Sequence, residues 1–391
     1  MDRTARNHAL DWLRVGGTVA VLLFHSARFF DAGDWHVKNP VFDPNLDIFA
    51  TILIQWLMPL FFVLSGAGAW LALQHQTPGR FAAAKVPRLL VPLVFGILVL
   101  SPPQVYLERL THHQFAGNLF EWLPHYFEGF YAFGGNFAWM GMHLWYLLVL
   151  LLWTYITMPL CLWLMKGAGQ KLAGFLARPG MLFLLALPVA LVELALKPGT
   201  LLAMQSMGGW SPLLYVIFYL FGFLLPAHEE MPKAFARHWW VGLSVGIIIP
   251  VAVLATGLMD TNAAYLSPLN ILLTLLRAVN AVAWLIGLIG IGYRFCTRKT
   301  RFLDLAGEAV LPFYMLHQAV LLVLGYFVMQ WPWANLAKFG FVFLATAAIN
   351  ILIYVSLIRP FRIGRFLFGM KPPRPSRSAA VPGPGRRLGA G

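Results

Sequence analysis

Long apolar segments dominate this sequence and decide what the chain can fold into. A helix needs about 20 mostly apolar residues to cross a bilayer, and about ten stretches of the chain approach that length. No water-soluble core could bury them all, because 59% of the 391 residues are hydrophobic and only 11% are charged. The sequence therefore predicts an all-α, polytopic transmembrane bundle of about ten helices. The expected spans are Leu10–Phe30, Ile48–Leu73, Val86–Leu100, Met142–Met165, Met181–Leu196, Pro212–Pro226, Trp239–Leu258, Pro268–Gly292, Ala309–Gln330 and Ala337–Ile358.

The distribution of basic residues predicts how the bundle is oriented. Lys and Arg number 29 against 15 Asp and Glu, and most of them fall in the two terminal segments and in alternate loops. Cytoplasmic loops carry this excess, so we expect both termini in the cytoplasm and no binding of nucleic acid. Residues 1–370 then form one transmembrane domain. Residues 371–391 are expected to be a disordered, basic, Pro/Gly-rich cytoplasmic tail.

Among the residues of the first expected span are Asp11, Arg14 and His25, ionisable side chains that the membrane interior disfavours. Eleven residues on a helix turn through about 1100°, so the side chains of Arg14 and His25 point the same way, roughly 16 Å apart along the axis. Arg14 lies towards the cytoplasm and could hold an anion, whereas His25 lies in the outer half and suits general base catalysis. Two structural alternatives remain: Arg14 as an interfacial anchor paired with Asp11, and His25 as a packing histidine.

Further polar residues recur in or beside the apolar segments. They are His143, Glu193, Arg277, Asn280, His317 and Gln318. Taken singly, each could be a hydrogen-bonding contact between helices; taken together, they predict a polar cavity inside the bundle. Lys85 and Arg88 are neighbours on a helix and could clamp a phosphate, or they could be ordinary cytoplasmic-side charge.

The sequence predicts no resident metal or bound cofactor. It contains neither a phosphate-binding glycine loop nor a His-Glu-x-x-His zinc motif. Its two cysteines, Cys161 and Cys296, cannot form a metal site alone.

Several motifs resemble the acyltransferase 3 family of integral membrane acyltransferases, over residues 9–372. The motifs are Leu10-Asp11-Trp12-Leu13-Arg14, Phe24-His25-Ser26, Met58-Pro59-Leu60-Phe61-Phe62-Val63-Leu64-Ser65-Gly66, Lys85-Val86-Pro87-Arg88, His143-Leu144-Trp145-Tyr146-Leu147 and Pro312-Phe313-Tyr314-Met315-Leu316-His317-Gln318. The segment from Arg365 to Pro372 resembles the branch that includes glucan succinyltransferases.

The resemblance implies an enzyme of the bacterial inner membrane that transfers acyl groups other than aminoacyl groups. It would move an acetyl or succinyl group from cytoplasmic acyl-CoA, its co-substrate, to a hydroxyl of a periplasmic or cell-envelope glycan. His25 matches the essential histidine of the family, and Arg14 matches its arginine partner. Arg14, Lys85 and Arg88 would bind acyl-CoA, although a lysine at position 85 lacks the bidentate geometry of the family's arginine.

The resemblance also implies an acceptor cavity. Its expected lining is His143, Trp145, His317, Gln318, Arg277 and Asn280. Arg277 would be the cation for the free carboxylate of a succinyl group. Two other functions use the same features: a transporter or flippase for an anionic or glycolipid substrate, and a non-catalytic subunit of an envelope-glycan assembly.

Overall fold

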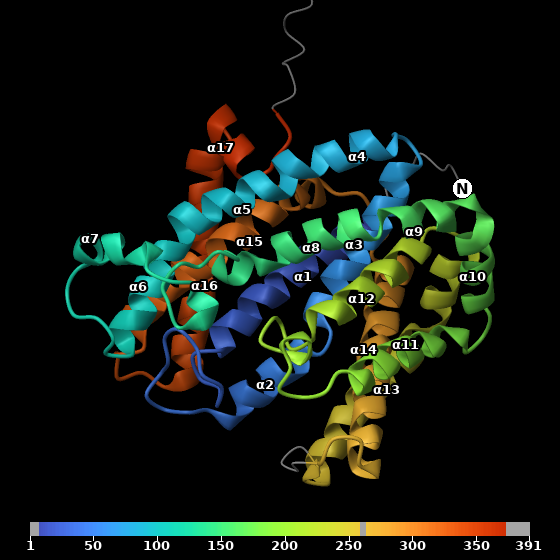
Figure 1. The fold of residues 1–391 in the computed structure, drawn as a ribbon, viewed down its shortest axis with the longest axis horizontal. Helices are drawn as coiled ribbons and strands as arrows, with labels where there is room; N and C mark the ends of the chain where they lie inside the picture. Colours follow the sequence, from blue (N-terminus) through green and yellow to red (C-terminus); the bar gives the residue numbers. More distant parts are fainter. Residues whose placement is uncertain (1–7, 259–262, 373–391) are drawn as a thin grey trace, which may run out of the picture.

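The computed structural model describes residues 8–258 and 263–372, and the regular elements of this part of the chain are helices joined by loops (Figure 1). Within these ranges no β-strand forms; the only backbone bridge joins Phe130 and Phe137. The prediction of an all-α fold is therefore confirmed. The predicted disordered tail lies outside the described residues, apart from positions 371 and 372.

α-Helices alternate with short 3₁₀ and π turns along the chain. The α-helices are α1 (His8–Ala27), α2 (Pro44–Ile54), α3 (Leu57–Leu73), α4 (Pro78–Lys85), α5 (Val91–Phe95), α6 (Ser101–Thr111), α7 (Leu119–Trp122), α8 (Trp145–Ile156), α9 (Met158–Trp163), α10 (Gly169–Leu176), α11 (Ala186–Ala195), α12 (Pro212–Leu224), α13 (Glu230–Ala255), α14 (Pro268–Phe295), α15 (Arg301–Val328), α16 (Asn335–Ile353) and α17 (Arg362–Leu367). The π turns are η1 (Val86–Leu90), η2 (Gly96–Leu100), η6 (Leu164–Ala168) and η10 (Tyr354–Ile358). The 3₁₀ turns are η3 (Leu123–Phe127), η4 (Tyr131–Phe133), η5 (Met142–Leu144), η7 (Met181–Leu185) and η8 (Leu201–Ala203).

Six helices in the described part are long and apolar enough to cross a membrane, or up to seven if one bent pair counts as a single span. The six are Pro44–Leu73, Pro78–Thr111, Glu230–Ala255, Pro268–Phe295, Arg301–Val328 and Asn335–Ile358. The bent pair joins Met142–Ile156 to Met158–Leu176 at 54°.

Three of the predicted spans are not in this set. The first, α1, carries Asp11, Arg14 and His25; the fifth and sixth correspond to the shorter apolar helices Met181–Ala195 and Pro212–Leu224. The count of about ten spans and the cytoplasmic side of the termini therefore stay predictions.

The third predicted span, Val86–Leu100, was too short at both ends. The helix runs without interruption from Pro78 to Thr111 through α4, η1, α5, η2 and α6. Pro102 and Pro103 do not end this helix, because they follow directly on the π turn η2 at the start of α6. The carbonyl oxygen of Ile97, five residues before Pro102, accepts a hydrogen bond from the hydroxyl of Tyr126 at 2.7 Å in place of the missing N–H. As a result, the polar residues of α6 are held on a helix beside the bundle.

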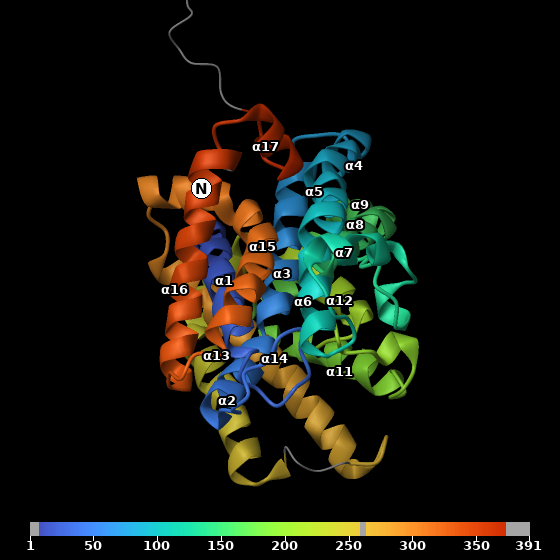
Figure 2. The same cartoon turned by 90° about the vertical axis from the view of Figure 1, so that its left-hand side faces the viewer.

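Helix α1 lies in the middle of the bundle and packs against α2, α3, α14, α15 and α16. Figure 2 shows α4 and α17 at one end of the bundle and α2 at the opposite end. Arg14 lies towards the first of these ends, which we call the Arg14 end. His25 lies towards the other, the His25 end. The central position of α1 explains how Asp11, Arg14 and His25 are accommodated on one helix, because protein rather than lipid surrounds them.

Two glycines let α3 and α12 approach each other closely. A Cβ atom on Gly66 would lie 1.9 Å from the carbonyl oxygen of Tyr219, and one on Gly222 would lie 1.8 Å from that of Val63. Small residues allow this backbone contact between membrane helices. The pair fixes the helix that carries Ser65.

Candidate functional site

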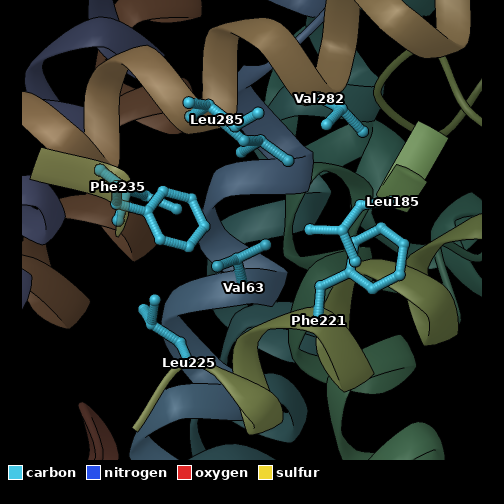
Figure 3. A pocket seen from close by; sticks show the side chains of 9 residues that line it. Val63, Leu185, Phe221, Leu225, Phe235, Val282 and Leu285 are labelled. Carbon is cyan, nitrogen blue, oxygen red and sulfur yellow. The ribbon is translucent and has the colours of Figure 1, made fainter. Parts of the chain in front are cut away.

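A small cavity between five helical elements is apolar and is not the candidate site. Side chains from α3, η7, α12, α13 and α14 line it, among them Val63, Phe221 and Phe235 (Figure 3). Its volume is about 10 Å³, and every lining residue is apolar. It offers neither a charge nor a hydrogen bond to a ligand.

Three histidines from distant parts of the sequence meet inside the bundle. His25 comes from α1, His143 from η5 and His317 from α15. The rings of His25 and His317 have their centroids 4.8 Å apart, and those of His143 and His317 lie 5.0 Å apart. The structure thus brings together three residues that the sequence singled out separately.

Hydrogen bonds assign the protons of this cluster. His317 Nδ1 lies 2.6 Å from the carbonyl oxygen of Tyr314 and must donate to it, so His317 Nε2 is an acceptor. His25 Nδ1 lies 2.9 Å from the carbonyl oxygen of Val21 and 3.2 Å from His317 Nε2, so it is protonated and donates. His25 Nε2 then carries the free lone pair, and no residue in the described part of the chain hydrogen-bonds to it. This nitrogen is available to take a proton.

His143 and Tyr314 connect the start of α8 to α15. The hydroxyl of Tyr314 donates to the carbonyl oxygen of His143, and His143 Nε2 donates to that of Met315 at 3.0 Å. His143 Nδ1 is therefore unprotonated, buried and without a hydrogen-bond partner among the described residues. A buried acceptor of this kind can be satisfied by a hydroxyl group of a bound molecule.

Arg14 both pairs with Asp11 and contacts the neighbouring helix. Its Nη1 lies 2.9 Å from Asp11 Oδ1, and its Nη2 donates to the carbonyl oxygen of Leu64 on α3 at 3.1 Å. The pairing with Asp11 that the sequence allowed is present. One-third of the Arg14 side chain remains exposed.

Lys85 and Arg88 join Arg14 in a cationic cluster. Arg14 lies close enough to Lys85 and Arg88 for its positive charge to interact with both of theirs. Lys85 Nζ lies 4.6 Å from the ring centroid of Phe81, but neither Lys85 nor Arg88 has a carboxylate partner in the residues that the structure describes. Cations that lack a counter-ion inside the protein are suited to an anion from outside it.

Tyr146 lies between the cationic cluster and the histidines. Its hydroxyl is 2.7 Å from Ser65 Oγ, and the charge of Arg14 acts on it. Its ring centroid is 5.8 Å from that of Tyr314, which in turn is 5.8 Å from that of His317. A line of polar and aromatic side chains therefore connects the Arg14 end of α1 with His25.

The family follows from a comparison with known proteins. Residues 7–355 match the acyltransferase 3 family, described as an acyltransferase domain. The chain belongs to this family. It is accordingly an acyltransferase, and its apolar helices make it a multi-pass membrane protein.

Curated relatives of this acyltransferase carry one name. Glucans biosynthesis protein C from Salmonella paratyphi A and from Salmonella agona are each 25% identical to it over 394 residues, covering 97% of this chain and 98% of theirs. The same protein from Salmonella schwarzengrund is 24% identical over the same coverage. No solved structure matches the chain.

Three side chains of the candidate site were not predicted from the sequence: Ser65, Tyr146 and Tyr314. All three lie within the motifs quoted above, and a signal was present. Tyr146 follows His143 by three residues and Tyr314 precedes His317 by three, a spacing that puts each pair on one helix face. The two tyrosines were not singled out because they are uncharged at neutral pH, unlike the basic and acidic residues on which the prediction was based.

Gln318 is buried beside His317 and contacts a residue that we had expected in a loop. Its Nε2 donates to Oε1 of Gln104 at 3.2 Å, and Gln104 Nε2 donates to the carbonyl oxygen of Leu100 at 2.7 Å. Both glutamines are almost fully buried. The extension of the third span into α6 is what makes this contact.

Arg277 belongs to a separate group of residues. Its Nη1 lies 2.6 Å from Glu193 Oε1, and its guanidinium lies 4.2 Å from the ring centroid of Trp210. It also donates to the carbonyl oxygen of Gly209. The carboxylate partner of this cation is thus supplied by the protein itself.

Trp145 and Asn280 likewise make no hydrogen bond or ring contact with the three histidines in the described part of the chain. Trp145 packs against Tyr215 of α12, with ring centroids 5.3 Å apart. Asn280 is buried on α14, and its Oδ1 has no partner among the described residues. No hydrogen bond or ring contact in the described chain joins Arg277, Trp145 or Asn280 to His25, so the predicted acceptor lining falls into two groups. In the described part, no set of three or more His, Cys, Asp or Glu residues could hold a metal ion.

Proposed function

We propose that this acyltransferase moves an acetyl or succinyl group from cytoplasmic acyl-CoA to a hydroxyl group of a periplasmic or cell-envelope glycan. The bacterial inner membrane would separate the two substrates, with both chain termini on the cytoplasmic side. The relatives' name, glucans biosynthesis protein C, supports a glucan as the acceptor. The basic residues that the sequence concentrates at the Arg14 end support a cytoplasmic donor.

In this proposal His25 is the general base. Its Nε2 takes the proton of the acceptor hydroxyl while the hydroxyl oxygen forms a bond to the thioester carbonyl carbon. The carbon–sulfur bond then breaks, and the proton held on Nε2 passes to the departing thiolate. The products are the glycan ester and CoA with a free thiol.

The observation that carries the proposal is the fixed tautomer of His25. Since its Nδ1 donates to Val21 and His317, the basic lone pair is on Nε2 before substrate arrives. Such preorganisation removes the need to reorient the base during reaction. His317 acts here as a positioning residue, comparable in role to the group that orients a catalytic histidine.

At the Arg14 end, Arg14, Lys85 and Arg88 would bind the phosphates of acyl-CoA. Lys85 and Arg88 have no carboxylate to release before an anion binds, within the described chain. The acyl chain and the pantetheine arm would then extend past Tyr146 towards His25. The roughly 16 Å of helix between Arg14 and His25 is a distance that an extended arm can span.

The test is a thiol-release assay on purified protein in liposomes. Acetyl-CoA or succinyl-CoA is supplied with a panel of glucans, and His25→Ala is compared with the parent protein. His238→Ala is the matched control, because His238 Nδ1 lies 2.8 Å from the carbonyl oxygen of Ala234 in the same i to i−4 arrangement on α13. We expect His25→Ala to lower glucan-dependent thiol release by about 10²- to 10⁴-fold, and His238→Ala to leave it unchanged.

Two results would overturn the proposal. One is full thiol release by folded His25→Ala protein. The other is a parent protein that consumes no acyl-CoA with any glucan yet moves a glycolipid or anion across the liposome membrane, which would make it a transporter.

A further inference from the structure

We propose that Trp35, His36 and Glu108 form a binding subsite for one hexose unit of the acceptor glycan, next to His25. The inference rests on the proposed function and extends it. Trp35 and His36 would touch the sugar, and Glu108 would position His36.

Trp35 supplies an aromatic surface that continues from the histidine cluster. Its ring centroid lies 6.1 Å from that of His25 and 5.5 Å from that of His36. The ring of Phe29 packs edge-to-face with that of Trp35, with ring centroids 4.9 Å apart. Trp35 is half-buried, so part of the indole remains open to a ligand. The C–H face of a pyranose ring can stack on such a surface while its hydroxyls reach polar groups at the edge.

Those polar groups are His36 and a buried carboxylate behind it. His36 Nδ1 hydrogen-bonds to Oε2 of Glu108, and an ionised carboxylate only accepts, so the proton is on Nδ1. His36 Nε2 is left with a free lone pair and has no hydrogen-bond partner in the described chain. It can accept a hydrogen bond from a sugar hydroxyl.

The carboxylate of Glu108 is fully engaged in holding this arrangement. Tyr131 donates its hydroxyl to Glu108 Oε2 at 2.6 Å, and Arg109 Nη1 lies 3.3 Å from Oε1. Burial, followed by the charge of Glu108, raises the pKa of Tyr131, so the phenol stays a donor. Glu108 therefore acts through His36 and not directly on a ligand.

The loop that carries Trp35 and His36 is pinned before any ligand binds. Lys38 Nζ lies 2.7 Å from Oδ1 of the buried Asp31. The hydroxyl of Thr111 on α6 donates to the carbonyl oxygen of His36 at 2.9 Å. A site on a pinned loop loses less entropy when it binds a ligand.

The subsite is also continuous with the unsatisfied acceptor described above. The ring centroid of Trp35 lies 6.1 Å from that of His25, and His143 belongs to the same cluster, with its ring centroid 5.0 Å from that of His317. His143 Nδ1 has no partner in the described chain. A flat aromatic ring with two neutral acceptors beside it matches the hydroxyl edge of a sugar. An anionic headgroup would instead require donors or cations there.

The test measures binding and catalysis separately. Isothermal titration calorimetry with a defined glucose oligosaccharide reports affinity without any turnover. Steady-state assays report KM for the oligosaccharide, KM for acyl-CoA and the slow hydrolysis of acyl-CoA in the absence of acceptor. The variants are Trp35→Ala, Trp35→Phe and Glu108→Gln. Trp333→Ala is the control, because Trp333 is an exposed tryptophan packed edge-to-face against Trp331 at the same end of the bundle.

We expect Trp35→Ala to weaken oligosaccharide binding and raise its KM roughly tenfold or more, as truncating an anchoring tryptophan does. KM for acyl-CoA and acceptor-independent hydrolysis should not change, Trp35→Phe should recover most of the loss, and Glu108→Gln should raise the oligosaccharide KM alone. Equal oligosaccharide affinity in Trp35→Ala and Trp333→Ala overturns the subsite. Because calorimetry needs no reaction, an inactive parent protein that still binds sugar through Trp35 would count against the proposed function and not against the subsite.

Discussion

The two ends of α1 solve the problem of polar groups in a membrane protein in opposite ways. At the Arg14 end, Arg14, Lys85 and Arg88 lie close enough for their positive charges to interact. Of the three, only Arg14 has a carboxylate partner in the described chain. At the His25 end, His25, His143 and His317 form a cluster of neutral imidazoles, and a hydrogen bond to a backbone carbonyl holds one ring nitrogen of each. The Arg14 end therefore has positive charges without enough counter-ions, whereas the histidines at the His25 end are held in fixed orientations. The first suits the capture of an anion, and the second suits a chemical step that requires a fixed orientation.

The largest expected effect comes from a cation that, unlike Lys85 and Arg88, is already paired. Arg277→Met would leave the carboxylate of Glu193 without its partner, and breaking such a pair costs about 3 kcal/mol of stability. We expect a lower unfolding temperature in detergent, measured by a thermal shift, with KM for acyl-CoA unchanged. The double variant Arg277→Met with Glu193→Met should recover much of the stability. A raised KM for succinyl-CoA alone would instead make Arg277 part of the donor or acceptor site.

The next largest effect tests the histidine cluster at the His25 end. His317→Leu removes one of the two acceptors of His25 Nδ1, leaving only the carbonyl of Val21, and should lower kcat by roughly 100-fold, in the range of a lost acid–base contribution. KM for acyl-CoA should not change, since the cations are untouched. His317→Gln keeps a hydrogen-bonding group and should be less impaired. If both variants retained full kcat, the orientation of His25 would not depend on His317.

A smaller effect is expected for the cationic cluster at the Arg14 end. Arg88→Ala or Lys85→Ala should raise KM for acyl-CoA by about tenfold, since a charge-assisted contact is worth about 1.4 kcal/mol. The value of kcat should stay the same, and the dependence of KM on salt should weaken. Lys171→Ala, an exposed lysine on α10, is the control. A fall in kcat without a change in KM would remove these cations from donor binding.

The smallest effect concerns Asp11, which partly neutralises Arg14. Asp11→Asn should lower KM for acyl-CoA by about two- to threefold, within the range of a partly exposed ion pair. Steady-state kinetics at low ionic strength would detect the change. An increase in KM would show that Asp11 is needed to hold the guanidinium in place.

The sequence predicted the helical class and the individual residues better than it predicted their grouping. His25, His143 and His317 stand out because each is an ionisable residue in an apolar context, yet no pattern in one chain shows that they converge. Glu108 was missed because composition after Leu100 suggested a loop, whereas α6 continues the helix. Arg277 was grouped with the histidines because it is another buried cation. Its ion pair with Glu193, 84 positions away, depends on tertiary packing.

Tyr146 has a consequence for the membrane itself. A protein with polar groups from one end to the other risks becoming a leak for protons and ions. Here the rings of Tyr146 and Tyr314 stand in the middle of the polar line, and Phe62 packs edge-on against Tyr146 at 5.0 Å. A slender acyl arm can slide between aromatic rings, but a hydrated ion must shed its water to do so. In the proposed reaction, Tyr146 and Tyr314 would lie between the donor and the acceptor. The same two rings would therefore preserve the electrochemical gradient of the cell.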